Sequence, residues 1–177
     1  MSRRLRLPLR RILQFVAGLI AGTLLWMWLA EPYNVLLARL TQPLVHIDAR
    51  LRDAQLVARG DRIDVVSSTG TLPPGNIPAV QLTFNVILLI ALFASNKRPF
   101  SDRNARAFAL SLLVVLLLHP VGAWIAVEST YATRAGEWSD AHYGAASSSI
   151  WLMAELFWRL TGMFGVAFGC WWVSGEH

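Results

Sequence analysis

Two ionisable residues lie inside a long apolar stretch near the end of the chain. Glu155 and Arg159 belong to Ser149–Val173, a run of 25 mostly apolar residues. At a rise of about 1.5 Å per residue, a helix of this length is long enough to cross a lipid bilayer. The spacing of four residues places the carboxylate and the guanidinium on one helical face. Ionisable groups inside a membrane span require partners or water, so the pair marks a candidate functional site.

Asn85 and His119 extend this candidate site to two other apolar stretches. Counted from the outer end of each predicted span, all four side chains lie about 9–15 Å below the outer surface. A charge-assisted pair of Glu155 and Arg159, with hydrogen bonds completed by Asn85 and His119, predicts an intramembrane polar site. Such a site suits a lipid headgroup or a peptide terminus, with Arg159 holding the anion. The alternative is an ion pair that only neutralises itself and fixes helix register.

The composition explains which elements must position these residues. The chain has 177 residues, of which 55% are hydrophobic and 15% are charged, which is little charge for a soluble domain of this length. The apolar residues form four blocks long enough to span a bilayer, at 12–30, 77–95, 107–127 and 149–173. The sequence therefore predicts an all-α membrane protein built as a four-transmembrane-helix bundle.

The segments between the blocks predict a small external α+β cap over residues 31–76. Apolar residues at helical spacing over 32–52, interrupted by Pro43, predict one or two short amphipathic helices on the membrane surface. Arg59-Gly60-Asp61 forms a turn signal between two short β-strand patterns, which indicates a β-hairpin. Residues 67–76 are expected to form a loop. The remaining connections are a loop at 96–106 and a second external loop at 128–148, with terminal tails at 1–11 and 174–177.

Charge sets the expected orientation. Nine basic residues lie in 1–11 and 96–106, whereas the two predicted external loops mix basic and acidic residues. The positive-inside rule then places both termini in the cytoplasm of a bacterium, with the chain in the inner membrane. Trp28 lies two residues before Ala30, where a cleavage signal requires a small residue, so the first span is an uncleaved signal anchor. The basic residues are expected to contact membrane lipids and not nucleic acid.

Two pairs of glycines at a spacing of four predict helix packing. Gly18 and Gly22 lie in the first span, and Gly165 and Gly169 lie in the fourth, at similar predicted depth. Small residues at this spacing allow two helix backbones to approach closely. The sequence therefore predicts that the first and fourth spans pack together at these glycines.

Signatures of catalysis and of metal binding are missing from the sequence. Cys170 is the single cysteine, which excludes an internal disulfide and a thiolate zinc cluster. The histidines have no spacing typical of a metal site, and no familiar nucleotide-binding or hydrolase motif occurs. We therefore predict no catalytic residue, no metal and no cofactor.

Three short segments resemble those of a known group of membrane proteins. They are Pro32-Tyr33-Asn34, Leu82-Thr83-Phe84-Asn85, and Tyr131-Ala132-Thr133 ahead of Trp138. In this order the chain resembles an exosortase-H-associated membrane protein, a small multi-span partner of the exosortases that sort anchored envelope proteins in Gram-negative bacteria. Exosortases themselves use an externally accessible Cys with Arg and His, whereas Cys170 is predicted near the cytoplasmic side. The resemblance implies an accessory subunit, with an exosortase as the candidate partner, and not the sorting enzyme.

The function predicted from the sequence is a non-catalytic accessory subunit of an envelope protein-sorting or secretion assembly, held in a larger membrane protein complex. One alternative is an intramembrane enzyme or carrier that uses Glu155, Arg159 and His119. Another is a membrane subunit of a pigment or electron-transfer complex, in which His119 and the eight tryptophans line a cofactor.

Overall fold

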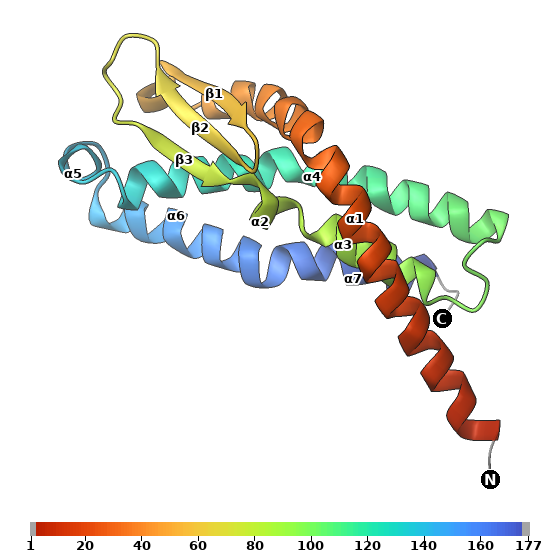
Figure 1. The fold of residues 1–177 in the computed structure, drawn as a ribbon. Helices are drawn as coiled ribbons and strands as arrows, with labels where there is room; N and C mark the ends of the chain where they lie inside the picture. The colour runs from red at the N-terminus through yellow and green to blue at the C-terminus, as the bar shows by residue number, and fades with distance from the viewer. Residues whose placement is uncertain (1–2, 175–177) are drawn as a thin grey trace.

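Three long apolar helices dominate the computed structural model, which describes residues 3–174, with side chains from Leu9 onward. They are α1 (Arg3–Val45), α4 (Asp102–Thr133) and the continuous helix Ala145–Ser174 (Figure 1). Each is long and apolar enough to cross a membrane. The prediction of a mostly helical chain with several apolar helices long enough to span a membrane is therefore confirmed. The predicted tails at 1–11 and 174–177 lie partly outside the described residues, and the first of them enters α1 at Arg3.

The block at 77–95 forms a shorter element than predicted, so the count of four spans is not confirmed. It folds as α2 (Ala79–Thr83) and α3 (Asn85–Ala94), with Phe84 between them. Together these helices cover fewer residues than the roughly 20 that a membrane crossing requires. Nearly every residue of α3 is buried, because it lies among α1, α4 and α7 (Met163–Ser174). A helix that is apolar on all sides belongs in such an interior.

The first helix continues well past its predicted end at residue 30. It remains α-helical through Pro32 and Pro43 as far as Val45, where separate amphipathic helices were predicted. Leu37 and Val45 are fully buried against the small sheet, and this packing outweighs the hydrogen bond that a proline removes from a helix interior. A short 3₁₀ turn, η1 (Ala49–Leu51), follows, and the Asp48 carboxylate caps it by accepting from the backbone N–H of Arg50 at 2.8 Å.

The predicted hairpin is present and carries an additional strand. Strands β1 (Ala54–Arg59) and β2 (Arg62–Ser67) pair antiparallel, and Gly60 in their turn has a φ of 61°. The third strand, β3 (Gly75–Pro78), pairs with β2 and begins inside the segment predicted as a loop. Ile77 of β3 lies opposite Ile63 of β2, and both side chains are buried. Burial of these apolar residues against α1 and α4 stabilises a sheet whose edge strand has a weak sequence pattern.

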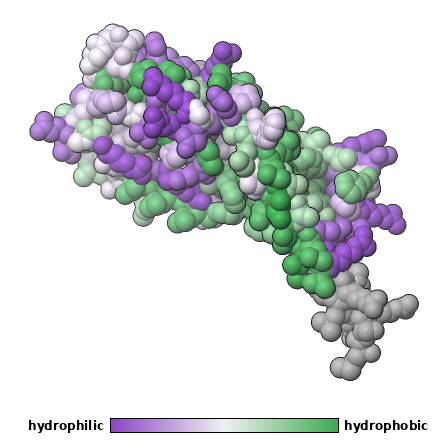
Figure 2. All heavy atoms as spheres, in the orientation of Figure 1, coloured by the Kyte–Doolittle hydropathy of each residue, from purple (hydrophilic) through white to green (hydrophobic). Residues whose placement is uncertain are grey.

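The core has two parts, which follow one another along the length of the molecule. One lies between the sheet, the second half of α1 and the end of α4, and it includes Leu37, Ile63 and Tyr131. The other surrounds α3 and includes Trp26 and Ala167. Hydrophilic side chains gather over the sheet, while hydrophobic side chains cover the long helices (Figure 2). The last helix is built from α6 (Ala145–Phe157), a π-helical turn η2 (Trp158–Gly162) and α7, and the short α5 (Glu137–His142) precedes it.

The two glycine pairs do not meet as the sequence predicted. A Cβ on Gly18 would lie 2.7 Å from Cβ of Ala94, and one on Gly22 would lie 3.4 Å from the Ile87 side chain, so α1 packs closely on α3. Gly165 and Gly169 of the last helix have no atom within 4 Å of such a position. The physical reason is that α3 contacts both α1 and α7 and occupies the space between them.

A different glycine sets the distance between α4 and the last helix. A Cβ on Gly122 would overlap Nε1 of Trp158, so we expect Gly122→Ala to lower the free energy of unfolding by about 1–3 kcal/mol through overpacking. Gly165→Ala is the matched control, because its Cβ would enter open space. Thermal unfolding of both variants in detergent micelles measures the difference, and equal melting temperatures would contradict the prediction.

Candidate functional site

The carboxylate of Glu155 is the centre of the predicted polar site. Its side chain is 2% exposed, and its Oε1 lies 2.6 Å from Nη2 of Arg159. Its Oε2 accepts hydrogen bonds from Nη2 of Arg134 at 2.9 Å and from Oγ of Ser129 at 2.6 Å. Two guanidinium groups therefore share one carboxylate, which leaves this cluster with one excess positive charge. Charge-assisted contacts of this kind are the stronger ones in a weakly polar interior.

Four different elements bring these groups together. Glu155 lies near the end of α6, and Arg159 follows one turn later in the π-helical segment η2. Arg134 is the residue that caps the C-terminus of α4. Arg159 also donates from Nη1 to Oε1 of Gln81 in α2, at 3.0 Å. The cluster thus joins α2, α4 and the last helix, and a π-helical turn at such a place re-aims the side chain that it carries.

The other two predicted residues form a separate pair. Oδ1 of Asn85 lies 2.7 Å from Nε2 of His119, and Nδ1 of His119 lies 2.6 Å from the hydroxyl of Tyr33. An amide oxygen only accepts, so we assign the ring proton to Nε2, and Nδ1 accepts from Tyr33. Among the described residues no hydrogen bond or ion pair connects these groups with Glu155 or Arg159. The single polar layer of the sequence prediction is therefore two distinct contacts.

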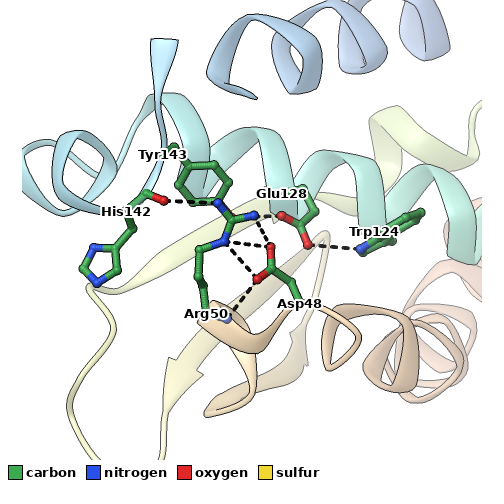
Figure 3. A network of polar contacts seen from close by, with 6 residues as sticks. All are labelled: Asp48, Arg50, Trp124, Glu128, His142 and Tyr143. Carbon is green, nitrogen blue, oxygen red and sulfur yellow. Dashed lines mark hydrogen bonds and ion pairs between the residues drawn. The ribbon is translucent and has the colours of Figure 1, made fainter. Parts of the chain in front are cut away.

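Sequence reasoning missed a second polar network outside the long apolar stretches. Arg50 donates from Nε to Oδ1 of Asp48 at 2.9 Å and from Nη1 to the carbonyl oxygen of His142 at 3.1 Å. Its guanidinium carbon lies 3.7 Å from the centre of the Tyr143 ring. The Tyr143 hydroxyl donates to Glu128 at 2.9 Å, and Figure 3 shows how the two acidic residues lie beside Arg50 (Figure 3).

The electrostatics of this network favour a charged Arg50 beside a charged Asp48. Burial of the Asp48 carboxyl opposes ionisation, but hydrogen bonds from the side chain and backbone of Arg50 outweigh it and lower the pKa of Asp48. Burial, reinforced by the charge of Glu128, raises the pKa of Tyr143, whose hydroxyl remains a donor. The network connects the end of α1 with α4 and with the segment before α6. It therefore links the segment between α1 and β1 to the helices.

Only part of this network had a signal in the sequence. Asp48 two residues before Arg50 is typical of a local turn capped by an acidic residue. Glu128 and Tyr143 are distant from Arg50 in the chain, so their contact depends on how the helices pack. Arg134 lies in the predicted external loop 128–148, and its contact with Glu155 likewise depends on how the helices pack. Among the described residues, no group of three or more His, Cys, Asp or Glu side chains is placed to hold a metal ion.

Comparison of the chain with models of protein families, with curated proteins and with solved structures found no match. The resemblance to exosortase-associated membrane proteins therefore stays a prediction.

A double variant and a triple variant together test how Glu155 is stabilised. Replacing both arginines, in Arg134→Gln/Arg159→Gln, leaves a buried carboxylate without an ionic partner, and we expect the free energy of unfolding to fall by about 3–5 kcal/mol. Adding Glu155→Gln removes the stranded charge and should restore most of that loss. Thermal unfolding in micelles measures both steps. A triple variant no more stable than the double variant would show that the charge is not what couples these residues.

A single carboxylate organises the loop between β2 and β3. Asp53 accepts hydrogen bonds from Ser67 and Ser68, from Oγ1 of Thr69 at 2.7 Å and from Oγ1 of Thr71 at 3.2 Å. Hydrogen bonds from Ser67, Ser68 and Thr69 lower the pKa of Asp53 well below its usual value.

A lowered pKa in the folded state predicts a stability that depends on pH. The stabilisation by Asp53 is present above the usual aspartate pKa of about 4 and is lost as the pH falls below it. We expect Asp53→Asn to lower the melting temperature at pH 7 and to flatten its decline between about pH 5 and pH 3. Thermal unfolding across this range is the measurement. A decline of unchanged slope in the variant would contradict this assignment.

Proposed function

We propose that the chain is a non-catalytic accessory subunit of a membrane assembly for envelope protein sorting or secretion, with an exosortase as the candidate partner. This proposal is based on the open face of α7, the side of the last helix that no other element among the described residues covers. Gly165 and Gly169 lie on α7, and a Cβ added at either glycine would have no atom within 4 Å. Within α7, only Met163 and Ala167 are buried.

This face has the composition of a helix-docking surface. Two glycines at a spacing of four allow a partner helix to approach the backbone closely, which favours dispersion contacts within lipid. Large side chains stand beside them, since Phe164 is 40% exposed, Phe168 46% and Trp172 68%. A shallow surface with bulky neighbours suits a transmembrane helix of another protein.

The interior polar groups support a structural role over an intramembrane enzyme or carrier. Glu155 is engaged by two arginines and a serine, and both ring nitrogens of His119 have hydrogen-bond partners. Groups that are paired in this way hold helices in place and do not exchange protons readily with a substrate. This arrangement favours the accessory role.

The proposal includes an orientation in the bacterial inner membrane. The basic residues near the start of α1 and between α3 and α4 lie in the cytoplasm under the positive-inside rule, and the sheet lies outside. In this arrangement α2 and α3 make the fourth crossing. Their length of about 24 Å is less than the usual bilayer core, and local thinning of the membrane accommodates the difference.

The experiment is capture of the partner from native membranes with glycine variants. We expect Gly165→Leu/Gly169→Leu to lose the proteins that copurify with the tagged wild-type chain, because the leucines block close approach. The chain itself should insert and melt normally, since a Cβ at either position would enter open space on an exposed face of α7. Gly165→Ala/Gly169→Ala keeps both residues small and is the matched control. An unchanged set of copurifying proteins in the leucine variant would contradict the proposal.

A further inference from the structure

A groove of about 610 Å³ opens between α1, α3 and the beginning of α4. Its walls are almost entirely apolar, and they include Ala17 and Ala21 of α1, Phe93 of α3 and Phe108 of α4. The volume lies within the range of about 300–1,000 Å³ that is usual for small-molecule sites. The groove is separate from Glu155, from His119 and from the open face of α7.

Helix geometry creates this groove. The α1 backbone touches α3 at Gly18, where a Cβ would lie 2.9 Å from Cα of Ala91. From there toward the N-terminus, α1 leans away from the other helices (Figure 1). Small residues on the facing side of α1 leave the resulting wedge open. The lining contains two polar residues, Gln14 and Asn104, and its other residues are apolar. Asn104 is already hydrogen-bonded to Asn96 at 2.5 Å and to the carbonyl oxygen of Pro99 at 2.7 Å, so the wedge presents a mostly apolar surface.

Exposed basic residues adjoin the groove lining in the chain. Lys97 and Arg98 directly precede the lining residues Pro99 and Phe100, and all but Pro99 are exposed. Segments 10–18 and 97–106 together hold six basic residues and one acidic residue, Asp102. The hydrophilic surface at this end of the molecule adjoins the hydrophobic surface of α1 (Figure 2).

The aromatic residue at the mouth indicates where the membrane surface lies. Phe100 is 98% exposed, although it belongs to a groove wall. An exposed Phe beside Lys and Arg is typical of segments that lie at the boundary between lipid headgroups and acyl chains. The apolar groove therefore begins at headgroup level and continues into the acyl-chain region.

We infer that the groove binds an anionic phospholipid. One acyl chain lies along the apolar wedge, and the phosphate-bearing headgroup is held by Lys97 and Arg98 at its mouth. The apolar acyl chain matches the apolar wedge, and the anionic headgroup matches the basic residues. The two parts of the lipid follow one another along the membrane normal in the same order as these two surfaces. This inference does not depend on the proposed accessory role, because it involves a surface separate from the open face of α7 and requires no protein partner.

The test is native mass spectrometry of the purified full-length chain in micelles that contain equal amounts of phosphatidylglycerol and phosphatidylcholine. We expect the wild-type chain to retain phosphatidylglycerol over phosphatidylcholine by about fivefold or more, as a basic headgroup site predicts. Ala21→Phe fills the wedge from an exposed position and should remove the retained lipid. Lys97→Gln/Arg98→Gln should keep a bound lipid but retain the two types equally.

Two variants separate this site from general lipid contact. Ala109→Phe adds the same bulk at an exposed position of α4 outside the groove, and Arg52→Gln removes a charge from the far end of the molecule. Both should retain lipid as the wild-type chain does. Should Ala21→Phe fail to fold, the exposed Lys97 and Arg98 variants still decide the headgroup assignment. Equal retention of both lipids by the wild-type chain, or a preference unchanged in Lys97→Gln/Arg98→Gln, would overturn the inference.

Discussion

The compensation of one buried carboxylate constrains how the end of α4 lies against α6. Glu155 is almost fully enclosed, and an isolated charge in such a place would be strongly destabilising. Arg159 satisfies it from the same helix, but Arg134 reaches it only because α4 ends beside α6. The helix ends must therefore stay in register for the charge to remain paired.

Polar contacts between distant segments also occur at other points along the length of the molecule. His119 joins α4 to α1 and α3 through Tyr33 and Asn85, and Arg50 joins the cap to α4 and to the segment before α6. At the other end, Nε1 of Trp171 donates to Asn96, which is itself hydrogen-bonded to Asn104. Each network connects helices that are distant in sequence. Because apolar side chains gain little by leaving lipid for a neighbouring helix, such polar contacts and close packing supply the specificity of the bundle.

Small residues have two different consequences in this fold. Gly18 and Gly122 lie where another element touches the backbone, so they are needed for packing within the chain. Gly165, Gly169 and the groove residues Ala17 and Ala21 are exposed. These small residues leave space for a molecule other than this chain. The two surfaces proposed for a partner helix and for a lipid both arise from this second group. They lie on different helices.

Features that depend on local spacing could be predicted from the amino-acid sequence. Glu155 and Arg159 meet because residues four apart share a helical face, and the hairpin forms at Gly60 because the strand patterns flank a turn. Contacts between distant segments, such as Arg134 at Glu155, required the packed structure. Packing against the sheet stabilises α1 as a continuous helix beyond Pro43. Because α3 lies between α1 and α7, the two glycine pairs do not meet. The spacing of neighbouring residues is fixed by the amino-acid sequence. Contacts between distant segments depend on which helix occupies the space between two others.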